Sequence, residues 1–300
     1  VFNDFTLTAD FLKAVLNATV DMRRDIVVES FSLDLGSMDL SRILAVVPEE
    51  IKHNLGIGPE RFATDITMSF KARSTAPYNL TTQSIPHADM ELTLTPGRLR
   101  YENVRLDRLG GRVTASLRGD NLDDAVFTLE DFIAAGPATD LHVNATATEV
   151  MTDPLIRGDI NGHTILRRLP RRLLEMLGGA LSGSIDADIK FTARPSMLTR
   201  NNFHRLHVEG DIDGHKLYYL GADTATMVFI NNLCLKFGTN NSHGGVDSLL
   251  SAVVRVDSAD ILKDNISIKL HGMALGVGAA NRKGMADTTR TVSYTHLTLP

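Results

Sequence analysis

The chain has 300 residues, of which 43% are hydrophobic and 22% charged, a balance that favours one large or two ordinary globular domains and excludes wholesale disorder. Its formal net charge of -5 offers no broad basic surface, so we expect no binding to DNA or RNA. The single cysteine, Cys234, excludes a disulfide framework and a cysteine-based zinc cluster, and no run approaches the roughly 20 apolar residues that span a bilayer.

A short helix is the first element that the sequence predicts. It covers residues 40–47, with Asp39 as its N-cap and apolar residues along one side. A second helix is expected over residues 164–176, where Gly178 and Gly179 mark the end and Pro170 introduces a kink or break. The remaining segments favour strands, so helices should be few and short.

Strands with one apolar and one polar face are expected along most of the chain, because apolar residues recur at every second position. In residues 184–194, for example, Ile185 and Ile189 alternate with Asp186 and Asp188. Strands of a buried parallel sheet would be apolar on both faces, so the pattern indicates a mainly β fold with an antiparallel sheet. Further alternating segments lie at residues 65–72, 88–94, 113–117, 141–147 and 266–270.

Residues typical of tight turns lie beside these alternating segments. They form the sequences TPG, GG, DG and HGG at residues 95–97, 110–111, 213–214 and 243–245. We expect the chain to reverse direction at these places, and the strands on either side to pair as hairpins.

An internal repeat organises the chain. The motif I-L-x-x-V-P that begins at Ile43 corresponds to I-L-x-x-L-P at Ile165, and the motif F-x-A-R at Phe70 recurs at Phe191. Downstream motifs follow in the same order at a spacing of about 120 residues, which is typical of repeated modules rather than of unrelated domains. We expect one fragment with two related modules, at approximately residues 1–125 and 126–291.

The last residues differ in character from the rest of the chain. Residues 292–300 (VSYTHLTLP) resemble the translation of a transposase adapter used in preparing sequencing libraries, so we expect a non-native tail that packs against nothing. The chain also begins without an initiator methionine or an apolar leader. We therefore expect an internal fragment of a longer protein, from which any membrane anchor is missing.

Three stretches combine glycines, an Asp-Pro step and apolar alternation. They are VRLDRLGGRVTASLRGDNLDDAVFTLEDFIAAG (104–136), TATEVMTDPLIRGDINGHTILRRLP (146–170) and LGGALSGSIDADIKFTARPSML (177–198). In these stretches the chain resembles the AsmA-like family, whose relatives include the TamB-type proteins. The resemblance implies a curled antiparallel sheet that forms an elongated groove, in a periplasmic protein anchored to the inner membrane of a Gram-negative bacterium.

The same resemblance implies a non-enzymatic role in which the groove carries phospholipid acyl chains between the inner and outer membranes and supports outer-membrane assembly. Phospholipids, the membrane and other envelope proteins would be the partners. An uncharged face suits acyl chains, since one unpaired charge there would cost on the order of several kcal/mol. The candidate groove-lining residues are Ile66, Met68, Phe70, Met90, Leu92, Leu94, Val113, Leu117, Leu141, Val143, Ile185, Ile189, Phe191, Ile266 and Ile268.

Arginines of the second predicted helix are candidates for binding anionic headgroups, because a basic amphipathic helix suits a lipid surface. A helix that keeps its arginines in water explains the same pattern. These residues are Arg167, Arg168, Arg171 and Arg172.

Motifs for nucleophilic catalysis, zinc, phosphate or dinucleotide binding are absent from the sequence. His204 and His207 are three residues apart, which on a strand places them on opposite faces, and Cys234 lies between leucines and is expected in the core. We predict no catalytic residues, no metal ligands and no cofactor. Two aspartate pairs, each two residues apart, should share a solvated face: Asp186/Asp188 and Asp211/Asp213.

The alternative function is that of a structural or adhesive β-solenoid or β-sandwich domain in a secreted or surface protein. Apolar alternation is equally typical of a sandwich core. A groove should leave its apolar face open, whereas a sandwich or solenoid should close it with a second layer.

Overall fold

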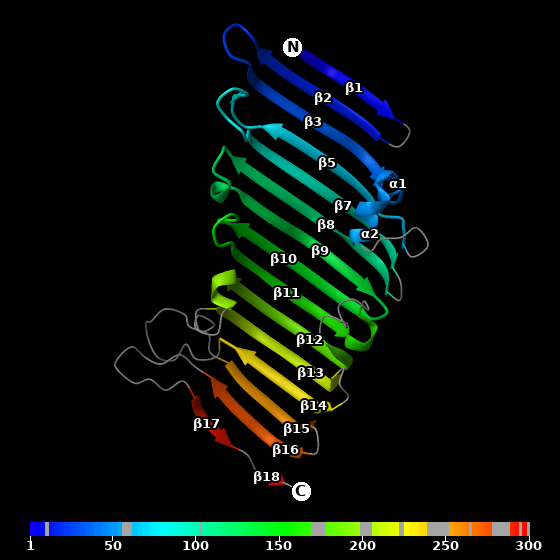
Figure 1. The fold of residues 1–300 in the computed structure, drawn as a ribbon, viewed down its shortest axis with the longest axis vertical. Helices are drawn as coiled ribbons and strands as arrows, with labels where there is room; N and C mark the ends of the chain where they lie inside the picture. The colour runs from blue at the N-terminus through cyan, green and yellow to red at the C-terminus, as the bar shows by residue number, and fades with distance from the viewer. Residues whose placement is uncertain are drawn as a thin grey trace, which may run out of the picture. The chain divides into compact units, whose positions relative to one another are not determined.

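The computed structural model describes residues 1–9, 12–55, 62–101, 104–169, 178–198, 206–221, 225–238, 252–263, 266–277, 289–293 and 296–298, which fall into two compact units (Figure 1). Unit 1 comprises Val1–Pro137 and His142–Ile156, and unit 2 comprises Ala138–Leu141 and Arg157–Pro300.

Unit 1 is an antiparallel sheet in which long strands pair in chain order. β1 pairs with β2, β2 with β3, β3 with β5, β5 with β7, β7 with β8 and β8 with β9, while β4 and β6 are short additions beside β7 and β3. The strands are β1 (Phe2–Ala9), β2 (Leu12–Asp21), β3 (Val27–Asp39), β4 (Phe62–Thr64), β5 (Thr67–Ser74), β6 (Tyr78–Asn79), β7 (His87–Tyr101), β8 (Val104–Arg118) and β9 (Val126–Gly136).

Unit 2 repeats this plan of neighbouring antiparallel strands. β12, β13, β14, β15 and β16 pair consecutively, and β16 also pairs with β17 and β18. The strands are β12 (Gly179–Ala193), β13 (His207–Gly221), β14 (Thr226–Phe237), β15 (Ala252–Lys263), β16 (Ile266–Val277), β17 (Thr289–Ser293) and β18 (His296–Thr298). The division between the units runs through β10 (Thr139–Thr148) and β11 (Leu155–Ile165).

This architecture confirms the predicted mainly β class, with a curled antiparallel sheet and few short helices. Each alternating segment of the sequence lies wholly or largely in a strand: 67–72 in β5, 88–94 in β7, 113–117 in β8, 141–147 in β10, 184–193 in β12 and 266–270 in β16. Only residues 65–66 and 194, at the ends of two segments, lie outside the strands. The burial of β10 follows the same period, since Leu141 and Val143 are half-buried while His142 and Asn144 are exposed.

The first predicted helix is confirmed, and the second is not. α1 (Leu40–Val46) begins after Asp39, whose side chain makes no capping hydrogen bond, and α2 (Glu49–Leu55) follows it. Residues 164–165 instead end β11, where the backbone N–H of Ile165 donates to the carbonyl of Ala138 at 2.7 Å. A single 3-10 turn, Leu166–Arg168, follows, and residues 170–177 lie outside the described residues.

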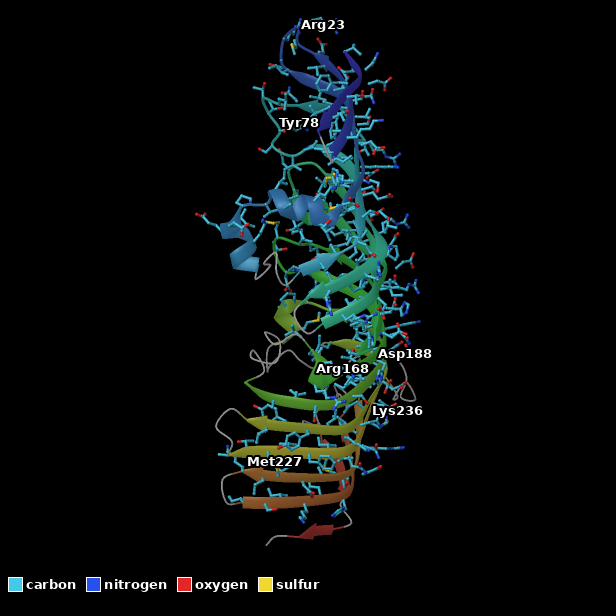
Figure 2. All side chains as sticks on the ribbon, turned by 90° about the vertical axis from the view of Figure 1, so that its right-hand side faces the viewer. Arg23, Tyr78, Arg168, Asp188, Met227 and Lys236 are labelled. Atoms are coloured by element: carbon cyan, nitrogen blue, oxygen red, sulfur yellow. The ribbon has the colours of Figure 1, made fainter. Side chains whose placement is uncertain are left out.

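The predicted turns at residues 95–97, 110–111 and 213–214 are wrong, because each lies inside a long strand: β7, β8 and β13. The strands continue through these residues and bend there, as the curvature of the unit 2 strands in Figure 2 illustrates. In unit 1 the register shifts between Leu94 and Gly97, between Gly110 and Arg112, and across Leu35/Met38. Such bulges bend a strand without ending it. The predicted turn at residues 243–245 lies outside the described residues.

In unit 2 the bend crosses four neighbouring strands at one level. Gly214, Leu233, Val256 and Met273 form one row of register partners, and the next row of the same face lies three residues away in every strand instead of two. That next row is Leu217, Ile230, Ala259 and Leu270. Two residues in left-handed backbone conformation, Lys216 and Gly272, lie between the rows. The extra residue keeps apolar side chains on one face on both sides of the bend.

The prediction that residues 292–300 pack against nothing is wrong for the described residues of this segment. β17 and β18 both pair with β16, with Val292 opposite Leu275 and Leu297 opposite Leu270. The extended, β-branched sequence of this segment satisfies the free backbone groups at the edge of β16, which any strand of suitable register can do.

Gly110 should be required for the bend in unit 1. A β-carbon at Gly110 would lie 2.8 Å from the backbone N and Cα of Pro96 on β7, whereas a β-carbon at Gly36 on β3 would meet only the Lys13 carbonyl, at 3.7 Å. We expect Gly110→Ala to destabilise the protein by roughly 1–3 kcal/mol through overpacking and Gly36→Ala to leave stability unchanged within about 0.5 kcal/mol. Thermal melts of both variants test this, and equal stability would contradict the proposed close approach.

Candidate functional site: an apolar face in each unit

One face of the unit 1 sheet carries continuous rows of apolar side chains. Residues that are direct register partners in an antiparallel sheet point to the same face, so the rows follow from the pairing. They cross every long strand from β1 to β9 and contain no Asp, Glu, Lys or Arg. The first row is Leu7, Ala14, Leu35, Phe70, Leu92, Val113 and Leu129, and the second is Phe5, Leu16, Leu33, Ala72, Met90, Ala115 and Phe127.

These side chains are only partly buried. Leu7 is 53% exposed and Val113 37%, while Phe70 and Leu92 are half-buried and only small members such as Ala115 are buried. A side chain in the core between two packed sheets would lose nearly all contact with water. The described long strands of unit 1 all belong to one sheet, so no second sheet within the described part of this unit covers the apolar face.

Unit 2 has an apolar face of the same kind across β12 to β16. Its rows also lack charged residues, and most of their described side chains are half-buried, with Val256 and Ala259 buried beside the bend. Two rows lie at the bend, and Ile185 extends the Gly214 row into β12. There are two further rows. One row is Leu181, Tyr219, Val228, Ile261 and Ile268, and the other is Ala187, Ile212, Leu235 and Val254.

The opposite face of the unit 1 sheet is held by ion pairs between neighbouring strands. Asp89 on β7 contacts Arg118 on β8 at 3.2 Å and Arg73 on β5 at 3.6 Å, and Arg112 pairs with Glu130 on β9. Figure 2 shows side chains with nitrogen and oxygen tips crowded on this side of the unit 1 ribbon, while α1 and α2 project from the other side. The two faces of one sheet therefore differ sharply in polarity.

Polar side chains also form a series of cross-strand contacts from β11 to β15 in unit 2, three of them hydrogen bonds and one an ion-pair contact. Asp186 contacts His163 Nδ1 at 2.7 Å and His215 Nε2 at 3.7 Å, and His215 Nδ1 lies 3.1 Å from Asn232 Oδ1. Asn232 Nδ2 then donates to Asp257 at 2.9 Å. These contacts lie at the level of the bend, where the strands have consecutive polar residues.

The two aspartate pairs that the sequence places on a solvated face lie on this polar face. Asp186 is opposite Asp213, and Asp188 is opposite Asp211. Among the described residues, no group of three or more His, Cys, Asp or Glu side chains is arranged to hold a metal ion. His207 contacts Glu209 instead, and His204 lies outside the described residues.

Cys234 differs from its expected place in the core. It is half-buried on the polar face, opposite Asp213 and Arg255. Burial raises the pKa of its thiol, and the neighbouring Asp213 carboxylate raises it further. The leucines on either side of Cys234 in the sequence suggested a core position. In β14 these leucines lie on the apolar face, and Cys234 between them lies on the opposite face.

Most of the predicted groove-lining residues lie on the two apolar faces. In unit 1 these are Met68, Phe70, Met90, Leu92, Leu94, Val113 and Leu117, and in unit 2 they are Ile185, Ile189, Phe191 and Ile268. Ile66 is 1% exposed and is therefore buried instead of lining an open surface; its carbonyl accepts a hydrogen bond from the backbone N–H of Leu40 at the start of α1. Ile266 is exposed at a strand end opposite Lys263, and Leu141 and Val143 are half-buried in β10.

The predicted headgroup arginines are only partly described. Arg167 and Arg168 are exposed in the 3-10 turn after β11, and Arg171 and Arg172 lie outside the described residues. The sequence reading missed the rows that β1, β2 and β3 contribute, although Phe31, Leu33 and Leu35 alternate clearly there. It also missed Leu217 and Leu233, because the bend interrupts strict alternation in β13 and β14.

Comparison with known proteins adds no relative: no protein-family model, curated protein or solved structure matches the chain. Within the described part of the chain, no helix has the length and apolar character needed to cross a membrane. The function must therefore be argued from the two faces themselves.

The Asp89 ion pairs should give unit 1 a stability that depends on pH. The pKa of Asp89 is lowered from its ordinary value of 3.8, first by the hydrogen bond from Ser116 and then by the positive charge and hydrogen bond of Arg118. A carboxylate with a lowered folded-state pKa stabilises the fold above its unfolded pKa, and this contribution is lost as the pH falls through the folded pKa. We expect Asp89→Asn to lower the melting temperature at pH 7 by about 2–4 °C, the shift that corresponds to about 1 kcal/mol.

The difference between Asp89→Asn and the unaltered protein should shrink as the pH falls below 3.8. Melts at a series of pH values check the sign. A difference that grew on acidification would show that the ion pairs of Asp89 do not stabilise the sheet.

Proposed function

We propose that the protein binds phospholipid acyl chains along its apolar faces and lets them move across the strands, as a non-enzymatic carrier of lipid. The observation that supports this is the set of charge-free rows that cross every long strand of unit 1 while their side chains stay partly exposed. A row of this kind offers an acyl chain apolar contacts from strand to strand with no charged group in its path.

The energetics favour such an occupant. Each methylene removed from water contributes about 0.8 kcal/mol, so one long acyl chain gains on the order of ten kcal/mol as an upper estimate. The polar headgroup would stay at the edge of the sheet, since burying it without partners costs on the order of several kcal/mol. An apolar face that is long, partly exposed and without charge suits a flexible hydrocarbon better than a protein partner, which usually brings a polar rim.

The setting proposed with this function rests on the family resemblance of the sequence. In that setting the protein stands in the periplasm, is attached to the inner membrane by a segment outside this chain, and passes phospholipid toward the outer membrane with the help of other envelope proteins. A closed sandwich or solenoid core is less well supported, because the apolar rows of unit 1 include side chains such as Leu7 and Val113 that are exposed.

Photocrosslinking at two adjacent residues tests the proposal directly. Val113 lies on the apolar face, and Thr114 points to the opposite face of the same strand, where it pairs with Glu91. A photoreactive residue at position 113 should crosslink to phospholipid in membranes or vesicles, whereas the same residue at position 114 should not. Equal labelling at both positions, or none at position 113, would contradict the proposed path.

A charge placed on the apolar face of unit 2 should block acyl chains and leave the fold intact. Ile189 is half-buried on this face opposite Gly210, and its neighbour Asp188 is exposed on the polar face. We expect Ile189→Asp to abolish crosslinking of lipid to unit 2 with only a small change in melting temperature, because water reaches an open face. Asp188→Asn is the matched control and should keep full crosslinking.

A large fall in the melting temperature of Ile189→Asp would indicate a closed core and would favour the sandwich alternative. Unchanged lipid crosslinking in a folded Ile189→Asp variant would also count against the proposal, since an ionised carboxylate in the path of an acyl chain costs on the order of several kcal/mol.

A further inference from the structure

The polar face of unit 1 has an excess of positive charge at one place, where β7 and β8 approach their connection. Register pairing sets Arg100 directly opposite Arg105. Arg98 lies two residues before Arg100 on the same face of β7. Gly97 and Leu99 of β7 are opposite Leu109 and Leu106 of β8, so β8 has one extra residue at this point. This register shift places Arg108 next to Arg98. We call Arg98, Arg100, Arg105 and Arg108 the arginine cluster.

The acidic neighbours of the cluster neutralise only part of its positive charge. Arg98 contacts Asp65 through Nε at 2.7 Å, and Arg105 contacts Asp107 through Nε at 3.1 Å. These contacts fix the two guanidinium groups but engage none of their terminal nitrogens, and the side chains are 75% and 68% exposed. Within the described part of the chain, Arg100 and Arg108 make no ion pair.

Elsewhere on the same face, charges of opposite sign are matched across the strands. Arg73 and Arg118 share Asp89, Arg112 lies between Glu91 and Glu130, and Lys71 is directly opposite Glu91. Like charges placed directly opposite each other destabilise a sheet. The arginine cluster is therefore a local exception in a chain whose formal net charge is -5.

We propose that the arginine cluster binds a phosphate group. Arginine is suited to this chemistry because its planar fork donates two parallel hydrogen bonds to phosphate oxygens. Arg100 and Arg105 would hold the anion between β7 and β8 and so relieve their mutual repulsion, while Arg98 and Arg108 supply further donors. Asp65 and Asp107 position two of the guanidinium groups before the anion arrives. This site does not depend on the acyl-chain function proposed above.

Calorimetric titration of the full chain with inorganic phosphate tests the site, at constant ionic strength with chloride as the competing anion. We expect saturable binding that weakens by about tenfold or more in Arg100→Gln with Arg105→Gln, since each lost charge-assisted hydrogen bond is worth roughly a factor of ten. A control variant, Arg24→Gln with Lys263→Gln, removes the same charge from exposed positions elsewhere and should bind normally. Both variants should melt near the temperature of the unaltered protein.

A second arm separates a lipid headgroup from free phosphate. Water-soluble, short-chain phosphatidylglycerol should compete with inorganic phosphate if the site takes a phosphodiester, and should fail to compete if it takes only the free anion. Either result supports a phosphate site. Absence of saturable binding to both probes, or equal weakening in the control variant, would overturn the proposal and leave only general attraction between charges.

Discussion

The structure depends on one constraint: every strand must keep its apolar side chains on the same face although the strand bends midway. Strict alternation would satisfy this in a straight strand, but a bend that inserts one residue would turn the second half of the strand over. In unit 2 the chain meets the constraint because four neighbouring strands all carry the extra residue at the same level, so the apolar rows on the two sides of the bend are three residues apart in each strand. The apolar face remains continuous for that reason.

Contacts on the polar face help to stabilise the sheet. The described strands all belong to one sheet, so no second sheet among them adds a buried core, and the fully buried large side chain among the described residues is Ile66. Cross-strand ion pairs around Asp89 and Arg112, and the polar contacts from His163 to Asp257, join neighbouring strands on the solvated side. Individually such surface contacts contribute little, and as networks that link several strands they contribute more.

Periodicity predicted the fold class well, because the alternation in β5, β12 and β16 follows from one local rule. It failed at the bends, since TPG, GG and DG have the same composition in a bulge as in a turn. Which of the two forms depends on the partner strand: Pro96 needs Gly110 opposite, and no local pattern announces that contact. The arginine cluster was equally hidden, because its members are separated in sequence by the connection between β7 and β8 and meet only through register. Ile66 was misplaced because its burial depends on tertiary packing against segments that are distant in sequence, such as Gly97 on β7.

The central claim is that the apolar faces take lipid acyl chains, and native mass spectrometry of the purified full chain tests it most directly. The account predicts adducts whose masses correspond to intact phospholipids, released when the solvent is made more apolar and absent from a folded variant that combines Leu92→Asp on the unit 1 face with Ile189→Asp on the unit 2 face. A protein that carries no lipid after purification from membranes, and takes up none from phospholipid micelles, would contradict the claim.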